Sequence, residues 1–334
     1  MCRTPDGGTG EAETPTVAKV IAAALRRPQN LCAHVWKTLN AILCCRTPAL
    51  GAHHYRCVDC GRDHLVPHSC RNRHCPDCQG ANAHEWLERQ EEDLLPVPYF
   101  HVVFTIPHSL NPLILQNPRA MHSLLFHCAS ATLLEFAHNK LGVRPGITAV
   151  LHTWTRQLIY HPHVHFLATG GGLDPTGAWR TAHPKFLVPV HALSKVFRAR
   201  FRDALREALP EVFAAIPVTV WRKDWVVHSK PVGSGEKAQI YLARYLYRVA
   251  LADSAILRHD EKQVVFRYRD RESGQARTAR LEPEEFIRRF LQHVLPKGFR
   301  KVRHYGLHHP SKRQALRLIQ VQLAFIHGLS VPSA

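Results

Sequence analysis

The stretch that decides the fold is His161-Pro162-His163-Val164-His165-Phe166, near the middle of a chain of 334 residues. Alternate residues of a β-strand point to opposite faces of a sheet, so this spacing sends His163 and His165 to one face and Val164 and Phe166 to the other. Two imidazoles on one face can converge on a divalent metal ion. The chain has 25 histidines, so a solvated or structural pair is the alternative interpretation.

The rest of the chain mixes two periodicities. Strands are expected where β-branched and aromatic residues cluster, at 100–106, within the hairpin-like stretch 147–166, and at 221–227. Helices are expected where apolar residues recur at helical spacing or a polar segment ends at proline, at 17–43, 81–95, 113–141, 191–209 and 236–252. The pattern predicts an α+β fold.

Positive charge runs through the whole sequence. Lys and Arg total 44 against 26 Asp and Glu, which gives a formal net charge of +18 and favours a polyanionic partner. No continuous apolar span approaches the roughly 20 residues that cross a membrane, and 17–25 is too short for a signal peptide. We therefore expect a soluble, cytoplasmic protein. Residues 1–16, rich in Gly, Pro, Thr and Glu, are expected to form a disordered leader.

Two Cys-x-x-Cys pairs, Cys57 with Cys60 and Cys75 with Cys78, are separated by fourteen residues. This spacing predicts two tight knuckles that place four thiolates around one structural zinc ion. Buried free cysteines are the alternative.

Further metal-binding side chains lie inside the same segment. As a second site or as replacements for a thiolate, the candidates are Cys70, His64, His68 and His74. Arg71 and Arg73 stand beside the second pair and are expected to contact DNA phosphates.

A second constellation involves tyrosine. Tyr241 and Tyr245 are one helical turn apart, so both hydroxyl groups can reach one site. A core or interface stripe is the alternative interpretation. Combined with the histidine pair and the positive charge, however, two phenols suit phosphodiester cleavage, which needs a cation on the phosphate and a nucleophile held in line.

Several basic residues are expected to bind DNA. Arg244, Arg248 and Lys230 lie on or just before the tyrosine helix and would clamp phosphates. The stretch 297–317 has seven Lys or Arg and no acidic residue, with Phe299 and Tyr305 interleaved. Its candidate phosphate contacts are Lys297, Arg300, Lys301 and Arg303. This composition suits either a groove in which aromatic rings stack on bases or an ordinary solvated surface.

Six short runs together resemble one family. They are 69–78 (SCRNRHCPDC), 104–108 (FTIPH), 161–165 (HPHVH), 241–248 (YLARYLYR), 295–299 (LPKGF) and 303–306 (RHYG). Their order and content over about 57–306 resemble the two-tyrosine rolling-circle transposases of the HUH endonuclease superfamily.

The resemblance implies an amino-terminal helical and zinc-binding domain at 17–95 and a catalytic domain at 96–280, with a central antiparallel sheet flanked by helices. A basic, helical carboxy-terminal region follows at 281–334. By position, His163 and His165 would ligate Mg²⁺ or Mn²⁺. The third ligand is left open among His152, Gln157 and His161.

Tyr241 and Tyr245 would be paired nucleophiles that nick single-stranded DNA at element ends and target through a 5′-phosphotyrosine. A phosphotyrosine would conserve the energy of the cut bond, so cleavage needs no ATP, and the sequence has no phosphate-binding Gly-x-x-x-x-Gly-Lys-Ser/Thr loop. Two other functions stay open at this stage: a zinc-containing DNA-binding regulator without catalysis, and a rolling-circle replication initiator.

Overall fold

The computed structural model describes residues 14–25, 31–78, 94–185, 187–234, 237–238, 240–241, 249–270 and 272–328. The chain forms two compact units, and each is built from two separate segments of the sequence. Unit 1 comprises 1–77 and 251–291, and unit 2 comprises 78–250 and 292–334. The sequence, in contrast, predicts contiguous domains with boundaries at 95 and 280. Those boundaries stay predictions.

Unit 1 contains short helices and two small antiparallel sheets. Its elements are α1 (Val17–Ala24), α2 (Ala33–Leu43), η1 (Pro48–Leu50), β1 (Ala52–Arg56), β2 (Asp63–Pro67), η3 (Asp253–Ala255), β9 (Ile256–His259), β10 (Val264–Arg269), β11 (Ala276–Leu281) and α10 (Pro283–Leu291). The Thr16 hydroxyl accepts the N–H of Lys19 and caps α1. The Asp253 carboxylate accepts the N–H of Val17 at 2.7 Å, which joins the two segments of this unit.

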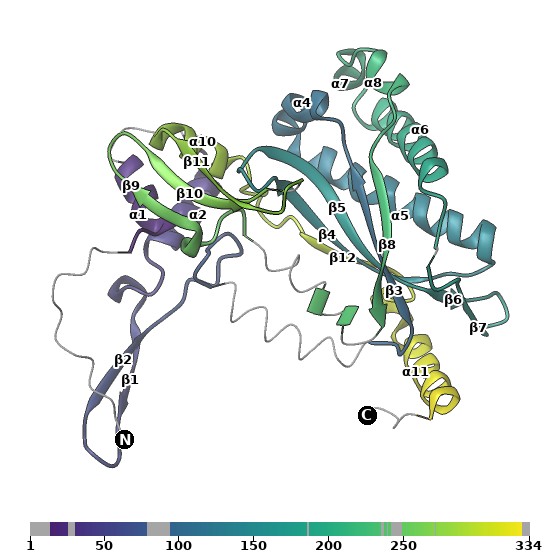
Figure 1. Cartoon of the computed structure of the whole chain (residues 1–334), viewed down its shortest axis with the longest axis horizontal. Coiled ribbons are helices and arrows are strands. Elements are labelled where there is room, and N and C mark those ends of the chain that lie inside the picture. The colour runs from purple at the N-terminus through teal and green to yellow at the C-terminus, as the bar shows by residue number, and fades with distance from the viewer. Residues whose placement is uncertain are drawn as a thin grey trace. The chain divides into compact units, whose positions relative to one another are not determined.

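Unit 2 is built around a five-stranded sheet in the order β12-β4-β5-β3-β8, with every neighbouring pair antiparallel (Figure 1). The strands of unit 2, which include the separate pair β6-β7, are β3 (Pro98–Thr105), β4 (Gly146–Trp154), β5 (Tyr160–Thr169), β6 (Gly171–Leu173), β7 (Trp179–Thr181), β8 (Val227–Ser234) and β12 (Val302–Gly306). Its helices are η2 (His108–Leu110), α4 (Asn111–Gln116), α5 (Pro118–Leu141), α6 (Val190–Ala208), α7 (Pro210–Ala214), α8 (Thr219–Arg222), η4 (Pro310–Lys312) and α11 (Arg313–His327).

One face of this sheet is apolar and packs against α5 and α6. Val164 and Phe166 of β5 are fully buried there, and Phe166 meets Phe104 edge to face at 5.4 Å. Phe104 in turn meets Phe197 of α6 at 5.0 Å. The predicted division of the histidine strand into an apolar and a histidine-bearing face is confirmed.

The opposite face is divided along its length. At one end Tyr99, Val150 and Leu167 form a second buried cluster with residues of α11 that include Ile319 and Leu323. Beyond this cluster the same face carries histidines. The fold therefore buries the sheet on both sides and leaves a polar area at one end of one face.

Two predicted elements differ from the observed ones. The helix expected at 113–141 is divided at Asn117, because Pro118 has no N–H and starts a new helix. The strand expected at 221–227 is wrong over most of its length. Trp221 lies in the short helix α8, and strand β8 starts only at Val227.

Some predictions fall outside the part of the chain that the structure describes. These are the leader up to residue 13, most of the helix at 81–95, and most of the helix at 236–252. In the last of these, residues 237–238 and 240–241 are described and helical, whereas 249–252 are described and lie outside any helix, so the predicted end at 252 is wrong. No helix in the described ranges has the length and apolar character needed to cross a membrane.

Candidate metal and nucleophile site

Three histidines of the central sheet come together. His152 of β4 pairs directly with His163 of β5, and His165 lies two residues further along the same face. One ring nitrogen from each lies within 4.8 Å of the other two, so the three imidazoles can hold one ion. His152 and His165 are buried, and His163 is half-buried. The predicted pair thus meets a third histidine.

The hydrogen bond of His163 fixes its ring. Its Nδ1 lies 2.7 Å from the carbonyl oxygen of His161. A carbonyl can only accept, so Nδ1 carries the proton and Nε2 keeps the lone pair that a metal requires. The ring is therefore in the tautomer of a metal ligand.

The other two candidates for the third ligand lie outside the triad. Gln157 sits in the turn between β4 and β5, where its backbone N–H bonds to the Thr155 hydroxyl. The ring of His161 stacks on His108 with centroids 4.7 Å apart. His152 is the candidate whose ring nitrogen lies within 4.8 Å of those of the pair.

His101 of β3 is a site residue that the sequence did not single out. Its Nε2 lies 2.7 Å from Nδ1 of His165, and the two rings stack with centroids 5.0 Å apart. Burial, helped by the nearby charges of Lys230, His228 and His163, lowers the pKa of His101 to about 3. His101 is therefore neutral near neutral pH, with one N–H to donate and one lone pair to accept.

Tyr241 completes a chain of side chains. Its hydroxyl oxygen lies 3.1 Å from Nδ1 of His101, and its ring meets His101 edge to face. The ammonium of Lys230 lies 5.0 Å from the centroid of the Tyr241 ring. His165, His101 and Tyr241 are thus joined by two successive hydrogen bonds. Tyr245, Arg244 and Arg248 lie outside the described residues.

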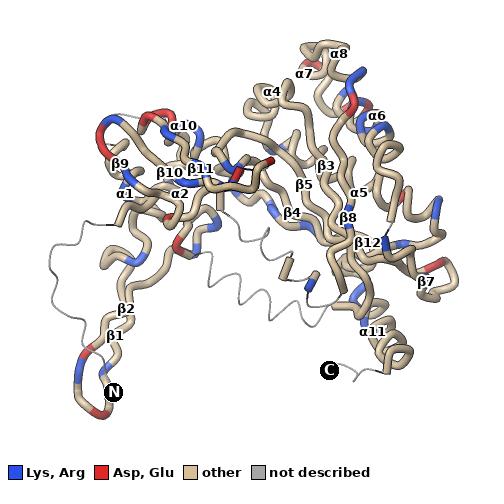
Figure 2. The backbone as a smooth tube through the Cα atoms, in the orientation of Figure 1, with Lys and Arg blue, Asp and Glu red and all other residues tan. Residues whose placement is uncertain are grey.

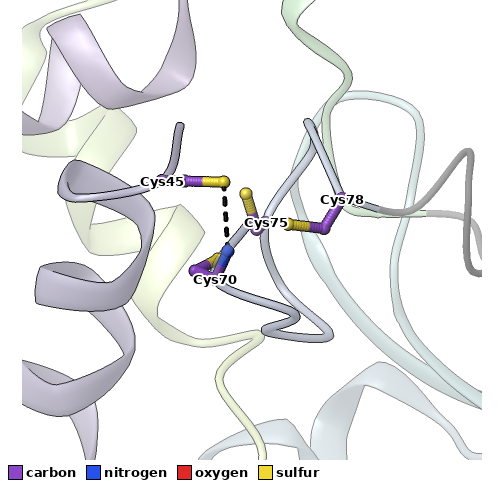
Figure 3. A group of neighbouring side chains, drawn as sticks. All are labelled: Cys45, Cys70, Cys75 and Cys78. Atoms are coloured by element: carbon purple, nitrogen blue, oxygen red, sulfur yellow. Dashed lines mark hydrogen bonds between the residues drawn. The ribbon is translucent and has the colours of Figure 1, made fainter. Parts of the chain in front are cut away.

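A second candidate metal site contains four cysteines. The sulfur atoms of Cys45, Cys70, Cys75 and Cys78 all lie within 4.8 Å of one another. Figure 3 shows these four side chains as neighbours. Cys45 follows helix α2 and Cys70 follows strand β2, while Cys75 and Cys78 form the second Cys-x-x-Cys pair. Four thiolates are the donor set of a closed structural zinc site.

Backbone groups support this use of the sulfur atoms. The N–H of Cys70 donates to the sulfur of Cys45 at 3.5 Å, and the N–H of Asn72 donates to the sulfur of Cys70 at 3.4 Å. Such bonds stabilise negative charge on sulfur, which a zinc ligand must carry. Cys75 and Cys78 are buried, so the cluster is shielded from water.

Cys57 and Cys60, predicted as ligands, are not part of this cluster. They lie in the turn that joins β1 to β2, at the far end of a hairpin whose strands have five residues each (Figure 1). Five extended residues span about 17 Å. The cluster is at the base of the hairpin, where the N–H of Arg46 bonds to the carbonyl of His68.

The other two members of the cluster are Cys70, which the sequence offered for a second site or as a replacement, and Cys45. Cys45 was missed because it lies well before the paired motifs, and its only signal is the Cys44-Cys45 doublet at the end of a helix. His64, His68 and His74 are not among the grouped ligands.

The predicted DNA-binding residues have diverse surroundings. Arg71, Lys297 and Arg300 are exposed, whereas burial lowers the pKa of Arg73. Lys301 lies over the ring of Trp154.

The groove in which Phe299 would stack on bases is not formed. Phe299 is buried in the main core, and Tyr305 packs against the same core. Arg303 stacks on Phe126 and Phe299, 4.4 and 5.2 Å from their centroids. Phe299 ends up inside because it closes the core beside α5, where burial of a phenyl ring is worth more than exposure.

The cysteine assignment is testable by substitution. Cys45→Ser or Cys70→Ser should lower the zinc content below about one ion per chain and lower the thermal midpoint by roughly 5–10 °C, because zinc binding contributes folding free energy. Zinc is measured by elemental analysis and the midpoint by circular dichroism. The double variant Cys57→Ser/Cys60→Ser is the control and should keep this ion. If only the control loses it, the original pairing is correct.

Comparison with known proteins identifies the family. Residues 146–315 match the Y2 family described as putative transposase, and residues 17–106 match the transposase zinc-binding domain of the IS91 type. The putative transposase y4qJ of Sinorhizobium fredii (strain NBRC 101917 / NGR234) is 36% identical over 319 residues, which cover 89% of this chain and 79% of the relative.

The transposase for insertion sequence element IS801 of Pseudomonas savastanoi pv. phaseolicola is 31% identical over 293 residues, covering 81% of this chain and 69% of the relative. No solved structure matches the chain. The family matches, these two relatives, the four-cysteine cluster and the central antiparallel sheet agree: the chain belongs to the IS91/IS801-type Y2 transposase family with an amino-terminal zinc-binding domain.

Proposed function

We propose that the protein nicks single-stranded DNA at the ends of its element and joins the strand to a target through a 5′-phosphotyrosine on Tyr241. The observation that supports this most directly is the hydrogen-bonded chain from His165 through His101 to the Tyr241 hydroxyl. It connects a candidate metal ligand to a candidate nucleophile within one unit.

The histidine triad fits a catalytic divalent cation. His163 keeps its Nε2 lone pair, and the ligating atoms of His152, His163 and His165 are close enough to share one ion. We propose Mn²⁺ or Mg²⁺ there. When bound, the cation would neutralise and polarise the scissile phosphate. Three imidazoles suit Mn²⁺ better than Mg²⁺, which prefers oxygen ligands.

The direction of the hydrogen bonds follows from metal binding. For His165 to bind a cation through Nε2, its Nδ1 must carry the proton and donate to Nε2 of His101. The neutral His101 then has its own proton on Nδ1, which faces the oxygen of Tyr241 at 3.1 Å. In this arrangement the Tyr241 oxygen accepts a hydrogen bond, and an accepted bond favours the phenolate over the phenol.

The proposed cleavage balances without a high-energy cofactor. The Tyr241 oxygen forms a bond to phosphorus while the bond between phosphorus and the 3′ oxygen breaks. The phenol loses its proton and the departing oxygen gains one, which leaves a 5′-phosphotyrosine and a 3′-hydroxyl. The covalent link conserves the energy of the phosphodiester for rejoining. Tyr245 is proposed as the second nucleophile on the resemblance to two-tyrosine transposases.

Lys230 is proposed to hold the phosphate of the attacked strand. It pairs with His101 across β3 and β8, and its ammonium lies over the Tyr241 ring. A cation beside the attacking oxygen would also attract the negatively charged DNA backbone.

Removal of the phenolic oxygens tests the nucleophile assignment. The double variant Tyr241→Phe/Tyr245→Phe should form no denaturant-resistant adduct with a single-stranded element-end oligonucleotide and Mn²⁺, while still binding that oligonucleotide. The adduct is scored by denaturing electrophoresis, and the modified residue is mapped by mass spectrometry.

Tyr247→Phe is the matched control on the same segment and should form the adduct like the unmodified protein. Persistence of the adduct in the double variant rejects the assignment. DNA binding by the unmodified protein with no adduct on any element end favours the regulator. An adduct only on a plasmid replication origin favours the initiator.

Metal titration tests the triad. His152→Ala should weaken Mn²⁺ binding at least about tenfold, because it removes one of three ligands. Binding is followed by the electron paramagnetic resonance signal of free Mn²⁺, which does not depend on cleavage. Gln157→Ala is the control and should leave the affinity unchanged. The reverse result would make Gln157 the third ligand.

His101 is expected to act as a positioning residue. His101→Leu should slow adduct formation about 10- to 100-fold even at saturating Mn²⁺, since a hydrogen bond to a charged oxygen is worth about 1.5–3 kcal/mol. It should also weaken Mn²⁺ binding about 10- to 100-fold, because His101 orients a ligand.

His101→Gln keeps a donor and an acceptor and should restore part of both properties. In the background of Tyr241→Phe, His101→Leu should still weaken Mn²⁺ binding. Normal metal affinity and normal adduct rate in His101→Leu would show that the hydrogen-bonded chain has no role.

A further inference from the structure

A basic surface lies in unit 1, on the three-stranded sheet β11-β10-β9. Partners directly opposite each other in an antiparallel pair share a face. Val265 pairs with Arg258 on one side and Arg280 on the other, while Arg267 pairs with Thr278 and Arg269 with Ala276. One face therefore carries four exposed arginines, here called the arginine face: Arg258, Arg267, Arg269 and Arg280.

The opposite face of this sheet fixes its orientation. Ile256, Val264 and Phe266 are buried, and Phe266 meets Phe286 of α10 with centroids 6.2 Å apart. Because side chains alternate along a strand, a slip of one residue would place arginines in this core. The arginines are therefore held on the outer face by the packing beneath them.

The arginine face carries exposed positive charge. None of the strand positions that share this face is acidic. Arg258 lies 3.4 Å from Asp260, but both side chains are largely exposed and such a pair is weak. Arg267 donates to the carbonyl of Ser254, and Arg269 donates to the carbonyl of Gly274. Bonds to carbonyls orient a guanidinium group and leave its charge in place.

We propose that the arginine face binds the phosphate backbone of double-stranded DNA. Arg267 and Arg269 are two residues apart on one strand, about 6.7 Å, so they present a row of cations along β10. Figure 2 marks these basic positions along β10 and β11. The partner is polyanionic DNA because the chain belongs to a DNA transposase family.

The composition of the face favours the duplex over a single strand. Surfaces that bind single strands without sequence preference combine cations with aromatic rings on which bases stack. Apart from arginine, the paired positions of this face hold Val265, Thr278 and Ala276, and none is aromatic. Contacts of this kind position a duplex without reading its sequence. The proposal rests on action on DNA, part of the proposed function, and not on the identity of the nucleophile.

Salt dependence of binding tests this proposal in the full-length protein. The probe is a blunt duplex DNA with no single-stranded end. In the double variant Arg267→Gln/Arg269→Gln, the slope of log K against log salt concentration should fall in magnitude by about 2, roughly one for each lost phosphate contact. Arg258→Gln/Arg280→Gln gives a second pair on the same face with the same expectation.

The matched control is Lys262→Gln/Arg277→Gln, which removes the same charge from the turn between β9 and β10 and from the opposite face of the sheet. It should keep the slope of the unmodified protein, and all variants should share its thermal midpoint. An unchanged slope in both face variants, an equal fall in the control, or tighter binding of duplex RNA than of duplex DNA would overturn the proposal. Adduct formation by the unmodified protein is scored separately, so failure of the nicking function is recognised independently.

Discussion

The structure of the candidate site depends on the strict alternation of side chains along β5. One set, Val164 and Phe166, is locked into the aromatic core with α5 and α6, and this forces His163 and His165 onto the other face. Burial then disfavours the charged form of an imidazole. It lowers the pKa of His101 to about 3. The same packing that stabilises the sheet thus keeps the His101 imidazole neutral, so that it can both donate and accept a hydrogen bond.

The sequence predicts those site residues that lie close together along one strand, and it does not predict those that come from different strands. The two-faced strand is visible in six residues and is confirmed, and the histidine pair that it presents lies beside a third histidine. His101 and His152 come from other strands, in which they sit among apolar residues with no pattern of their own. They join the site because β3 and β4 flank β5 on either side. Strand order is a property of the whole chain, so no local pattern predicts it.

The cysteine cluster shows what a local pattern leaves open. A Cys-x-x-Cys pair indicates that two thiolates can share an ion, but it does not say which other pair they meet. Cys57 and Cys60 lie in the turn of an exposed hairpin, which places them away from the cluster at its base. Cys45, at the end of α2, lies in the cluster instead. The number of residues between two cysteines therefore does not give the distance between their sulfur atoms, because an extended hairpin can separate them.

The positive charge of the chain likewise cannot be interpreted from the sequence alone. A net charge of +18 states only how far the 44 Lys and Arg outnumber the 26 Asp and Glu, whereas the structure distinguishes these cations by what they contact. Arg303 stacks between core rings, Arg200 pairs with Glu135, and Arg180 pairs with the buried carboxylate of Asp174. The positive charges of these arginines already interact with groups of the protein itself. DNA affinity arises from cations that release counterions from phosphates. It should therefore depend more on where exposed arginines lie than on the total charge of the chain.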